Sequence, residues 1–191
     1  MKSVKFNVVL LAGDRGPEDR LRQAARVPAK ALVPVGGRAM LLRVLAVLRH
    51  SPLVNQIVIV GPDSEAIANN EALEQVLPHH REQSIQKQSE GIYWLPPQQG
   101  PSASAVSGLT LLEELQANSN PLPTLITTAD HALLTRATVE SFLLQASQAQ
   151  ADVLAALVEK SAAAQAMPGS QRTGLKFRDG TYCGCNLFAV M

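Results

Sequence analysis

The sequence is poor in aromatic residues, carries almost no net charge and contains no long apolar run. Phe, Trp and Tyr make up 4% of the 191 residues, so Leu, Val and Ala must fill the core. A formal charge of +1 argues against nucleic-acid binding, which normally needs a clearly basic face. No stretch approaches the ~18 apolar residues of a membrane-spanning helix. These absences argue against a nucleic-acid-binding protein and against a membrane protein.

Cysteine is scarce as well. Cys183 and Cys185 are separated by one residue, so they are poorly placed to bridge each other, and two thiols cannot form a disulfide framework. We interpret them as small buried thiols in a cytoplasmic protein, where thiols stay reduced. The apolar run 8–12 is too short for a signal peptide. The length suits a single domain over residues 1–191, and the apolar segment 185–191 predicts that a C-terminal part is missing.

Apolar runs and helical periodicities alternate along the chain. We predict strands at 4–11, 56–61, 92–96, 123–130 and 152–159. We predict helices at 39–49, 64–77, 103–117 and 135–150, with Ser64 and Thr135 as N-caps. Polar loops are expected at 14–30 and 78–91, and a β-hairpin around the turn Asp179-Gly180. The alternation predicts an α/β fold, a three-layer αβα sandwich with a mostly parallel, mixed sheet.

Ligands of such sheets bind outside the carboxyl ends of the strands, so the loops after Leu11, Gly61, Leu95 and Thr128 should line the site. The first of these loops reads LAGDRGPEDRLR. Its glycines allow a close backbone approach to an anion, and several cations follow them: Arg15, Arg20, Arg22, Arg26 and Lys30. The spacing fits neither a Walker P-loop nor a dinucleotide fingerprint. The pattern therefore indicates a triphosphate site, with an ordinary solvated loop as the alternative.

Asp130 follows the predicted strand LITTA directly. A carboxylate in this position can bind Mg²⁺, which prefers oxygen ligands and shares them with substrate phosphates. A turn or N-cap aspartate is the alternative, since Thr135 soon starts a helix. Asp152 opens a strand at the wrong edge of the sheet and Asp179 lies in a turn, so a second metal ligand is expected beyond residue 191.

The pattern LAG..G...RL.........K.L.P..G..ML resembles the signature of the MobA-like NTP transferases, nucleotidyltransferases with a Rossmann-like GT-A-type fold. The chain departs from that signature where Asp14 replaces the second glycine and two extra residues precede Arg20. Ala31 and Ala39 stand where the family has prolines. Asp14 either helps to hold a metal or weakens nucleotide binding.

The resemblance implies roles for individual residues. Nucleotide binding falls on Leu11, Ala12, Gly13, Gly16, Gly100, Pro101, Ser102 and Ser104. The catalytic residues are Arg20, Lys30 and Asp130, with Asp130 also the metal ligand and Asn186 contacting the acceptor. Plain N-capping is the alternative for the serines, and a surface histidine is the alternative for His131, which follows Asp130.

The activity that the resemblance implies is transfer of an NMP from an NTP to a phosphorylated small-molecule acceptor, dependent on Mg²⁺, with release of pyrophosphate. One alternative is a catalytically silent nucleotide or nucleotide-sugar binding module on the same fold. Another is a scaffold whose arginine-rich loop docks a partner. No residue selects the NTP, the acceptor or the oligomeric state.

Overall fold

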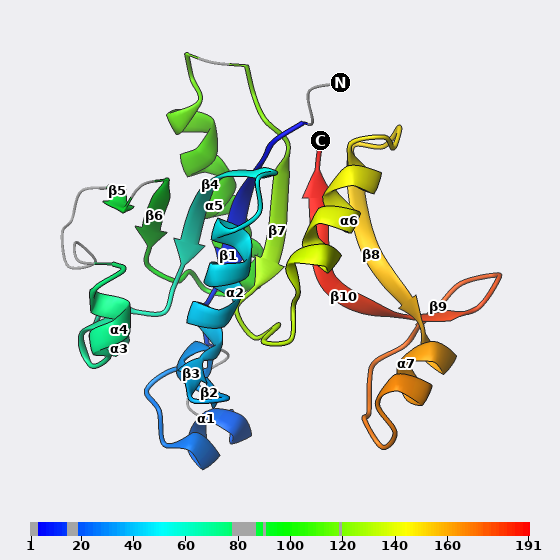
Figure 1. The fold of residues 1–191 in the computed structure, drawn as a ribbon, viewed down its shortest axis with the longest axis horizontal. Helices are drawn as coiled ribbons and strands as arrows, with labels where there is room; N and C mark the ends of the chain where they lie inside the picture. The colour runs from blue at the N-terminus through cyan, green and yellow to red at the C-terminus, as the bar shows by residue number, and fades with distance from the viewer. Residues whose placement is uncertain (1–3, 15–18, 78–86, 90, 119) are drawn as a thin grey trace.

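The computed structural model describes residues 4–14, 19–77, 87–89, 91–118 and 120–191. Its centre is an eight-stranded sheet in the order β5-β6-β4-β1-β7-β10-β8, with β9 paired to β10 (Figure 1). The strands are β1 (Phe6–Leu11), β4 (Val54–Val60), β5 (Lys87–Ser89), β6 (Ile92–Leu95), β7 (Thr124–Thr128), β8 (Val153–Glu159), β9 (Leu175–Lys176) and β10 (Thr181–Val190). β6, β4, β1 and β7 are parallel, whereas β10 is antiparallel to both β7 and β8. The predicted mixed, mostly parallel sheet is confirmed.

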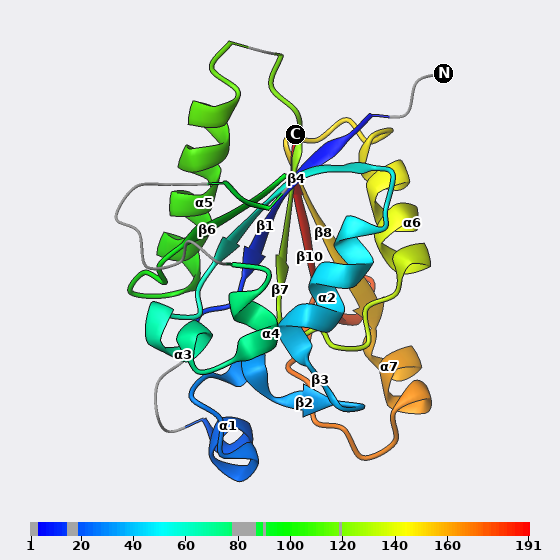
Figure 2. The ribbon, with the colours of Figure 1, turned by 60° about the vertical axis from the view of Figure 1, so that its left-hand side comes forward.

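Helices cover both faces of this sheet. α5 (Pro101–Leu115) lies on one face, and α2 (Met40–Arg49) and α6 (Arg136–Ala146) lie on the other (Figure 2). Side chains of β1 alternate between the two layers, because successive residues of a strand point to opposite faces. Phe6, Val8 and Leu10 join the larger core cluster, and Val9 joins the smaller cluster beneath α5. The three-layer arrangement is therefore the predicted one.

α5 packs unusually close to the sheet at Gly108. A Cβ atom on this residue would lie 2.7 Å from Cγ1 of Val9, which is too short for a normal contact. Because Gly108 has no side chain, the backbone of α5 can lie close to β1. The helix begins at Pro101 with Gly100 as its N-cap residue, not at residue 103 as the sequence predicts.

The same face of the sheet is open over its other half. Val9 pairs with Ile126, Ile126 with Phe188, and Phe188 with Ala155. Paired residues point to the same face of a sheet, so these side chains all lie on the face that α5 packs against. No helix of the described residues covers this part of the face, where Val153, Leu157 and Phe188 are 64%, 41% and 40% exposed. Half of one sheet face therefore presents apolar side chains to solvent.

The predicted helix at 64–77 is wrong as a single element. It is two short helices, α3 (Ser64–Ala68) and α4 (Glu71–Glu74). The side chain of Asn70 accepts a hydrogen bond from the backbone N of Leu73 at 3.1 Å and so starts a new helix. Asp63, not Ser64, caps α3 by accepting from the N of Ala66 at 2.8 Å. Short polar side chains that bond to nearby backbone favour helix starts over helix interiors.

Several short elements lie where the sequence predicts loops. α1 (Arg20–Ala25) and the 3₁₀ helix η1 (Lys30–Leu32) fall in or at the end of the predicted loop 14–30, and β5 falls in the predicted loop 78–91. β2 (Pro34–Val35) and β3 (Arg38–Ala39) form a small separate hairpin. α7 (Lys160–Ala166) follows β8 without a loop and is rich in alanine, the best helix former.

The C-terminal segment is more than the predicted hairpin. β9 and β10 pair at two positions only, and β10 instead runs between β7 and β8. The predicted cap of α6 is confirmed, since Oγ1 of Thr135 accepts from the N of Thr138 at 3.2 Å. Across the described residues, the helices are all too short or too polar to span a bilayer.

Candidate active site

A cavity of about 130 Å³ lies at the carboxyl ends of the central parallel strands. Its walls are residues 11–14 after β1, Lys30 and Ala31 of η1, part of the β6–α5 connection, and residues 128–130 after β7. Three of the four predicted loops therefore line it. The loop after β4 does not line the cavity but packs behind it. Gly61 has φ +81°, and a Cβ there would lie 2.8 Å from the backbone N of Gly13.

The ion pair between Lys30 and Asp130 crosses this cavity. Nζ of Lys30 lies 2.5 Å from Oδ2 of Asp130, although the two residues are 100 positions apart in the sequence. Oδ1 of Asp130 accepts a hydrogen bond from Oγ1 of Thr128 at 2.6 Å. The two side chains are 23% and 31% exposed, so a ligand can reach both. The parallel pairing of β1 with β7 places Asp130 beside the loop that follows β1, and Lys30 reaches it from the start of η1.

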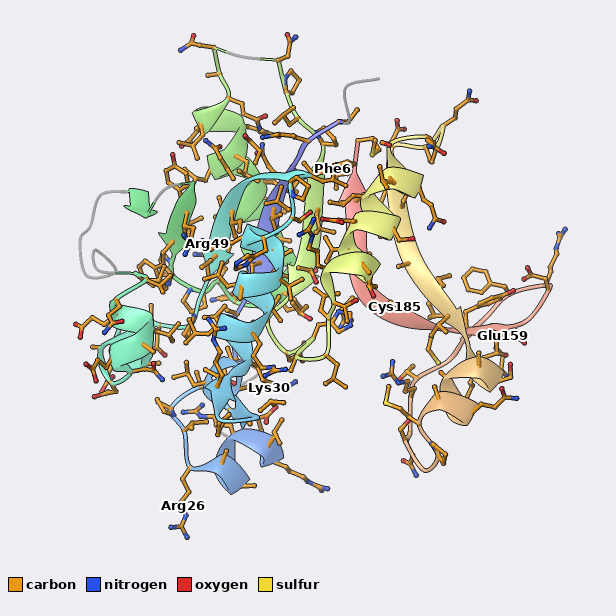
Figure 3. All side chains as sticks on the ribbon, in the orientation of Figure 1. Phe6, Arg26, Lys30, Arg49, Glu159 and Cys185 are labelled. Atoms are coloured by element: carbon orange, nitrogen blue, oxygen red, sulfur yellow. The ribbon has the colours of Figure 1, made fainter. Side chains whose placement is uncertain are left out.

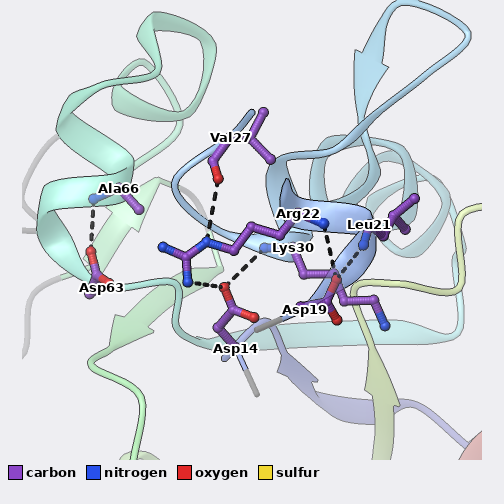
Figure 4. A network of polar contacts seen from close by, with 8 residues as sticks. All are labelled: Asp14, Asp19, Leu21, Arg22, Val27, Lys30, Asp63 and Ala66. Carbon is purple, nitrogen blue, oxygen red and sulfur yellow. Dashed lines mark hydrogen bonds and ion pairs between the residues drawn. The ribbon is translucent and has the colours of Figure 1, made fainter. Parts of the chain in front are cut away.

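Asp14, the main departure from the family signature, organises the cationic side of the cavity (Figure 4). Its Oδ2 atom accepts from Nη1 of Arg22 at 3.1 Å and from the backbone N of Lys30 at 3.2 Å. Arg22 also donates from Nε to the carbonyl of Val27 at 3.4 Å. The carboxylate therefore fixes an arginine and the backbone of the lysine at the cavity rim.

The predicted cation Arg20 lies elsewhere. It is exposed at the start of α1 and does not line the cavity, whereas Arg22 contacts the cavity residue Asp14. Two positions along a helix correspond to a rotation of about 200°, so the two side chains leave α1 on different sides. Asp19 sets this rotation, because its side chain accepts from the backbone N of Leu21 and of Arg22. The D-R-L-R pattern is the signal that could have identified Arg22.

The other predicted nucleotide residues are distributed unevenly. Leu11, Ala12, Gly13, Gly100, Pro101 and Ser104 line the cavity. Ser104 is buried and its Oγ accepts from the backbone N of Gln98 at 3.1 Å, which ties the β6–α5 connection to the helix. Ser102 is exposed and does not line the cavity, and Gly16 lies outside the described residues. Gln98 is a lining residue that the sequence reasoning missed.

A second cavity, of about 390 Å³, adjoins the first at Asp130. It extends to His131, to the Cys185–Asn186 segment of β10 and to α7. β10 is irregular here, since its register with β8 shifts between Gly184 and Phe188 and Asn186 has φ +53°. Figure 3 shows Lys30 below the strand ends and Cys185 on β10 to the right of it. The structure therefore brings Asn186 to the same cavity wall as Asp130.

Two titratable groups of this second cavity have shifted pKa values. Burial lowers the pKa of His131 below its ordinary 6.5, the Asp130 carboxylate raises it, and Arg172 lowers it further. The imidazole is therefore protonated less often at pH 7 than that of a free histidine. Burial also raises the pKa of the Cys185 thiol, with Arg172 acting in the opposite direction and Cys183 in the same one. Cys183 is buried, as predicted, whereas Cys185 is partly exposed, so the prediction of a buried thiol is wrong for Cys185.

The cavity offers few ligands for a metal. The described residues contain no cluster of three or more His, Cys, Asp or Glu side chains that could hold an ion. Asp14 and Asp130 are the two carboxylates that line the first cavity within the described part of the chain. Asp179 instead accepts from the hydroxyl of Tyr182 at 3.2 Å. Mg²⁺ commonly binds through one or two carboxylates plus substrate phosphates, so these residues fit a metal that arrives with a nucleotide.

Comparison with sequence families gives one match that covers most of the chain. A family model described as the MobA-like NTP transferase domain matches residues 8–167. The matched segment contains both sides of the Lys30–Asp130 pair and ends at the α7 boundary. No curated protein sequence matches the chain.

Solved structures of nucleotidyltransferases share the fold. A hypothetical transferase from Thermus thermophilus is 24% identical with a TM-score of 0.64, over 98% of this chain and 65% of its own length. 4-Diphosphocytidyl-2C-methyl-D-erythritol synthase from Anaerococcus prevotii is 13% identical with a TM-score of 0.60, over 98% and 71%. A CMP:2-keto-3-deoxy-manno-octonic acid synthetase in complex with CTP is 13% identical with a TM-score of 0.57, over 98% and 74%. The expected GT-A-type fold is therefore confirmed, and the chain spans about two thirds of the length of the Thermus structure.

Proposed function

The chain belongs to the MobA-like NTP transferase family, and on that premise we propose that it transfers an NMP from an NTP to a phosphorylated small-molecule acceptor. The observation that carries the proposal is the convergence of Lys30 and Asp130 at the junction of two cavities. One cavity then takes the nucleotide and the other takes the acceptor.

The transfer forms one bond and breaks one bond at the α-phosphorus of the NTP. An oxygen of the acceptor phosphate attacks this phosphorus, and the bond to the bridging oxygen of the β-phosphate breaks. Pyrophosphate leaves with the electron pair, and the product is a phosphoanhydride between the NMP and the acceptor. The attacking phosphate oxygen is already deprotonated, so the protein needs no general base for this step. Its contribution is positioning and charge stabilisation.

Lys30 and Arg22 supply the positive charge for the triphosphate. Both already bond to carboxylates, Lys30 to Asp130 and Arg22 to Asp14, so the phosphates replace one anionic partner with another. Guanidinium and ammonium groups form strong charge-assisted hydrogen bonds with phosphate oxygens. The start of α5 at Gly100 and Pro101 lies against the same cavity and supports the ribose and base side of the nucleotide.

Asp130, with Asp14 as the second carboxylate, is the group that would hold Mg²⁺. When bound, the metal would neutralise phosphate charge during the transfer. Thr128 orients Asp130 for this role through its hydrogen bond to Oδ1, which leaves Oδ2 for the partner that replaces Lys30. Asp14 would either bind the metal directly or hold Lys30 in place through its hydrogen bond with the backbone N of Lys30.

One observation favours the second candidate function, a nucleotide-binding module without catalysis. The carboxylate of Asp14 occupies a backbone N–H of Lys30 and the guanidinium of Arg22, two donors that a phosphate could use. A negative charge in this loop weakens nucleotide binding unless a metal or a cation neutralises it.

Measurement of pyrophosphate release separates the two functions. The four common NTPs are incubated with Mg²⁺ and a panel of phosphomonoesters, in parallel with a thermal-shift measurement of binding. A transferase releases pyrophosphate only with an acceptor, whereas a binding module shows a thermal shift and no release. Lys30→Ala and Asp130→Ala should each lower turnover by on the order of 10²–10³, the effect of a lost charge-stabilising group. Asp152→Ala, at the opposite end of the sheet, is the matched control. Turnover that survives both site changes would refute the assignment.

A further inference from the structure

The second cavity carries information about the acceptor that the family assignment does not. Within the described residues, Asp130 lines both cavities, and the remaining walls of the second come from residues 131–186. If the nucleotide occupies the first cavity, the acceptor phosphate must reach the α-phosphorus from the side of Asp130. The organic part of the acceptor then extends between β10 and α7.

The charges of this cavity favour a single phosphate group. Arg172 lines it and has no ion-pair partner among the described residues. Asp130, on the same cavity, carries the opposite charge. A phosphate dianion next to the Asp130 carboxylate needs a nearby cation, and Arg172 is the arginine that lines this wall. One guanidinium fits one phosphate with two parallel hydrogen bonds.

The opposite wall is apolar. Ala162, Ala163 and Ala166 of α7 line the cavity together with Val158 of β8 and Met167. The three alanines lie on one side of the helix, since Ala166 is the i+4 neighbour of Ala162 and the i+3 neighbour of Ala163. Their small side chains leave the space that a ligand body would fill. An apolar body gains free energy by covering this wall, whereas the hydroxyl groups of a sugar or polyol would find no hydrogen-bond partner on its carbon atoms.

We propose that the acceptor is a phosphomonoester with one phosphate and a largely apolar, ring-sized organic body, held by Arg172 and the alanine face of α7. This assignment of substrate class rests on the proposed transferase function. Arg172 binds the acceptor phosphate, and Asn186 borders the same space from β10. Polyol and sugar phosphates, which carry the same charge on a hydroxyl-rich body, are disfavoured by the apolar wall.

Cys185 provides a direct test of binding that does not depend on turnover. It lines the cavity and is partly exposed, whereas Cys183 is 1% exposed, so alkylation of the folded protein reports Cys185. Labelling with iodoacetamide is followed by mass spectrometry at mildly alkaline pH, because burial raises the pKa of this thiol. Phenyl phosphate should slow the labelling at least fivefold, and glycerol 3-phosphate at the same concentration should not. Equal or better protection by glycerol 3-phosphate would overturn the proposal.

Two pairs of variants locate the bound probe. Arg172→Ala should abolish the protection by phenyl phosphate, whereas Arg178→Ala, in the β9–β10 turn, should retain it. Ala166→Leu should fill the cavity and abolish protection, whereas Ala164→Leu, on the same helix but outside the cavity, should not. Circular dichroism verifies that each variant is folded. Protection that survives both Arg172→Ala and Ala166→Leu would refute the site.

The two proposals fail in distinguishable ways. NTP binding is measured by calorimetry on the same variants and should stay within twofold of the parent for Ala166→Leu. With phenyl phosphate as acceptor, that variant should lose at least tenfold in the kcat/KM of pyrophosphate release. Protection of Cys185 without any pyrophosphate release contradicts the transferase function and leaves the apolar phosphomonoester site intact. Release with glycerol 3-phosphate and none with phenyl phosphate contradicts the substrate class alone.

Discussion

Replacing Asp130 with asparagine is expected to strengthen NTP binding in the absence of Mg²⁺ and to weaken it in the presence of Mg²⁺. Nζ of Lys30 lies 2.5 Å from Oδ2 of Asp130. An NTP must therefore take the lysine from a carboxylate, and it must also approach that carboxylate with its own negative charge. Asparagine removes both costs, but it also removes the proposed metal ligand.

The size of the first effect follows from the exposure of the pair. Ion pairs at partly exposed positions contribute up to about 1 kcal/mol, and the side chains here are 23% and 31% exposed. The repulsion between the carboxylate and the triphosphate, screened by nearby water, adds a term of similar size, about 1 kcal/mol. A total of about 1–2 kcal/mol corresponds to binding that is roughly 5- to 30-fold tighter. Loss of about 1 kcal/mol from the free protein should lower the melting temperature by only about 2–4 °C.

Isothermal titration calorimetry measures the effect. The NTP that binds the parent protein is titrated with EDTA and then with excess Mg²⁺, at constant ionic strength. Asp152→Asn, an exposed aspartate at the other end of the sheet, is the control and should leave both affinities unchanged. If Asp130→Asn binds metal-free NTP no more tightly than the parent does, Lys30 is not a phosphate ligand and the reasoning fails.

Two further changes test the cationic rim and the support of α5. Arg22→Ala should weaken NTP binding about tenfold, the loss of one charge-assisted hydrogen bond, whereas Arg20→Ala should change it less than twofold because that side chain is exposed and does not line the cavity. A larger loss from Arg20→Ala would show that α1 rotates when the nucleotide binds, so that Arg20 contacts it. Gly108→Ala should lower the melting temperature by several degrees, since overpacking a tight contact such as that with Val9 costs about 1–3 kcal/mol. A variant as stable as the parent in a thermal melt would contradict the close approach of α5 to β1.

The edge of the sheet that carries the site was predictable from local signals. Apolar runs that end in Gly13 or just before Asp130 mark the carboxyl ends of parallel strands, and parallel strands end at one edge. The sequence alone therefore predicted that the first loop and Asp130 share a cavity. The family signature gave Lys30, already one of the loop's cations, a catalytic role, although its distance from Asp130 in sequence carries no information about their distance in space.

The parts that escaped prediction depend on contacts beyond the local sequence. The choice of Arg22 over Arg20 depends on one turn of helix that begins at Asp19, inside a segment that reads as a polar loop. Arg172 carries no motif, and it lines the second cavity from the connection between α7 and β9, beside β10, which enters the sheet between β7 and β8. Long-range antiparallel insertion of this kind leaves no periodic signal in the sequence. The open apolar face around Phe188 also follows only from the pairing register.

The order in which the two cavities are built along the chain has a consequence for how such a protein can diversify. Every described residue of the first cavity lies at or before Asp130, and every described residue of the second cavity lies at or after it. A crossover between related genes near this codon would replace the residues of the acceptor cavity and keep those of the nucleotide cavity unchanged. Recombination could thus give the scaffold new acceptors while the nucleotide preference stays as it was.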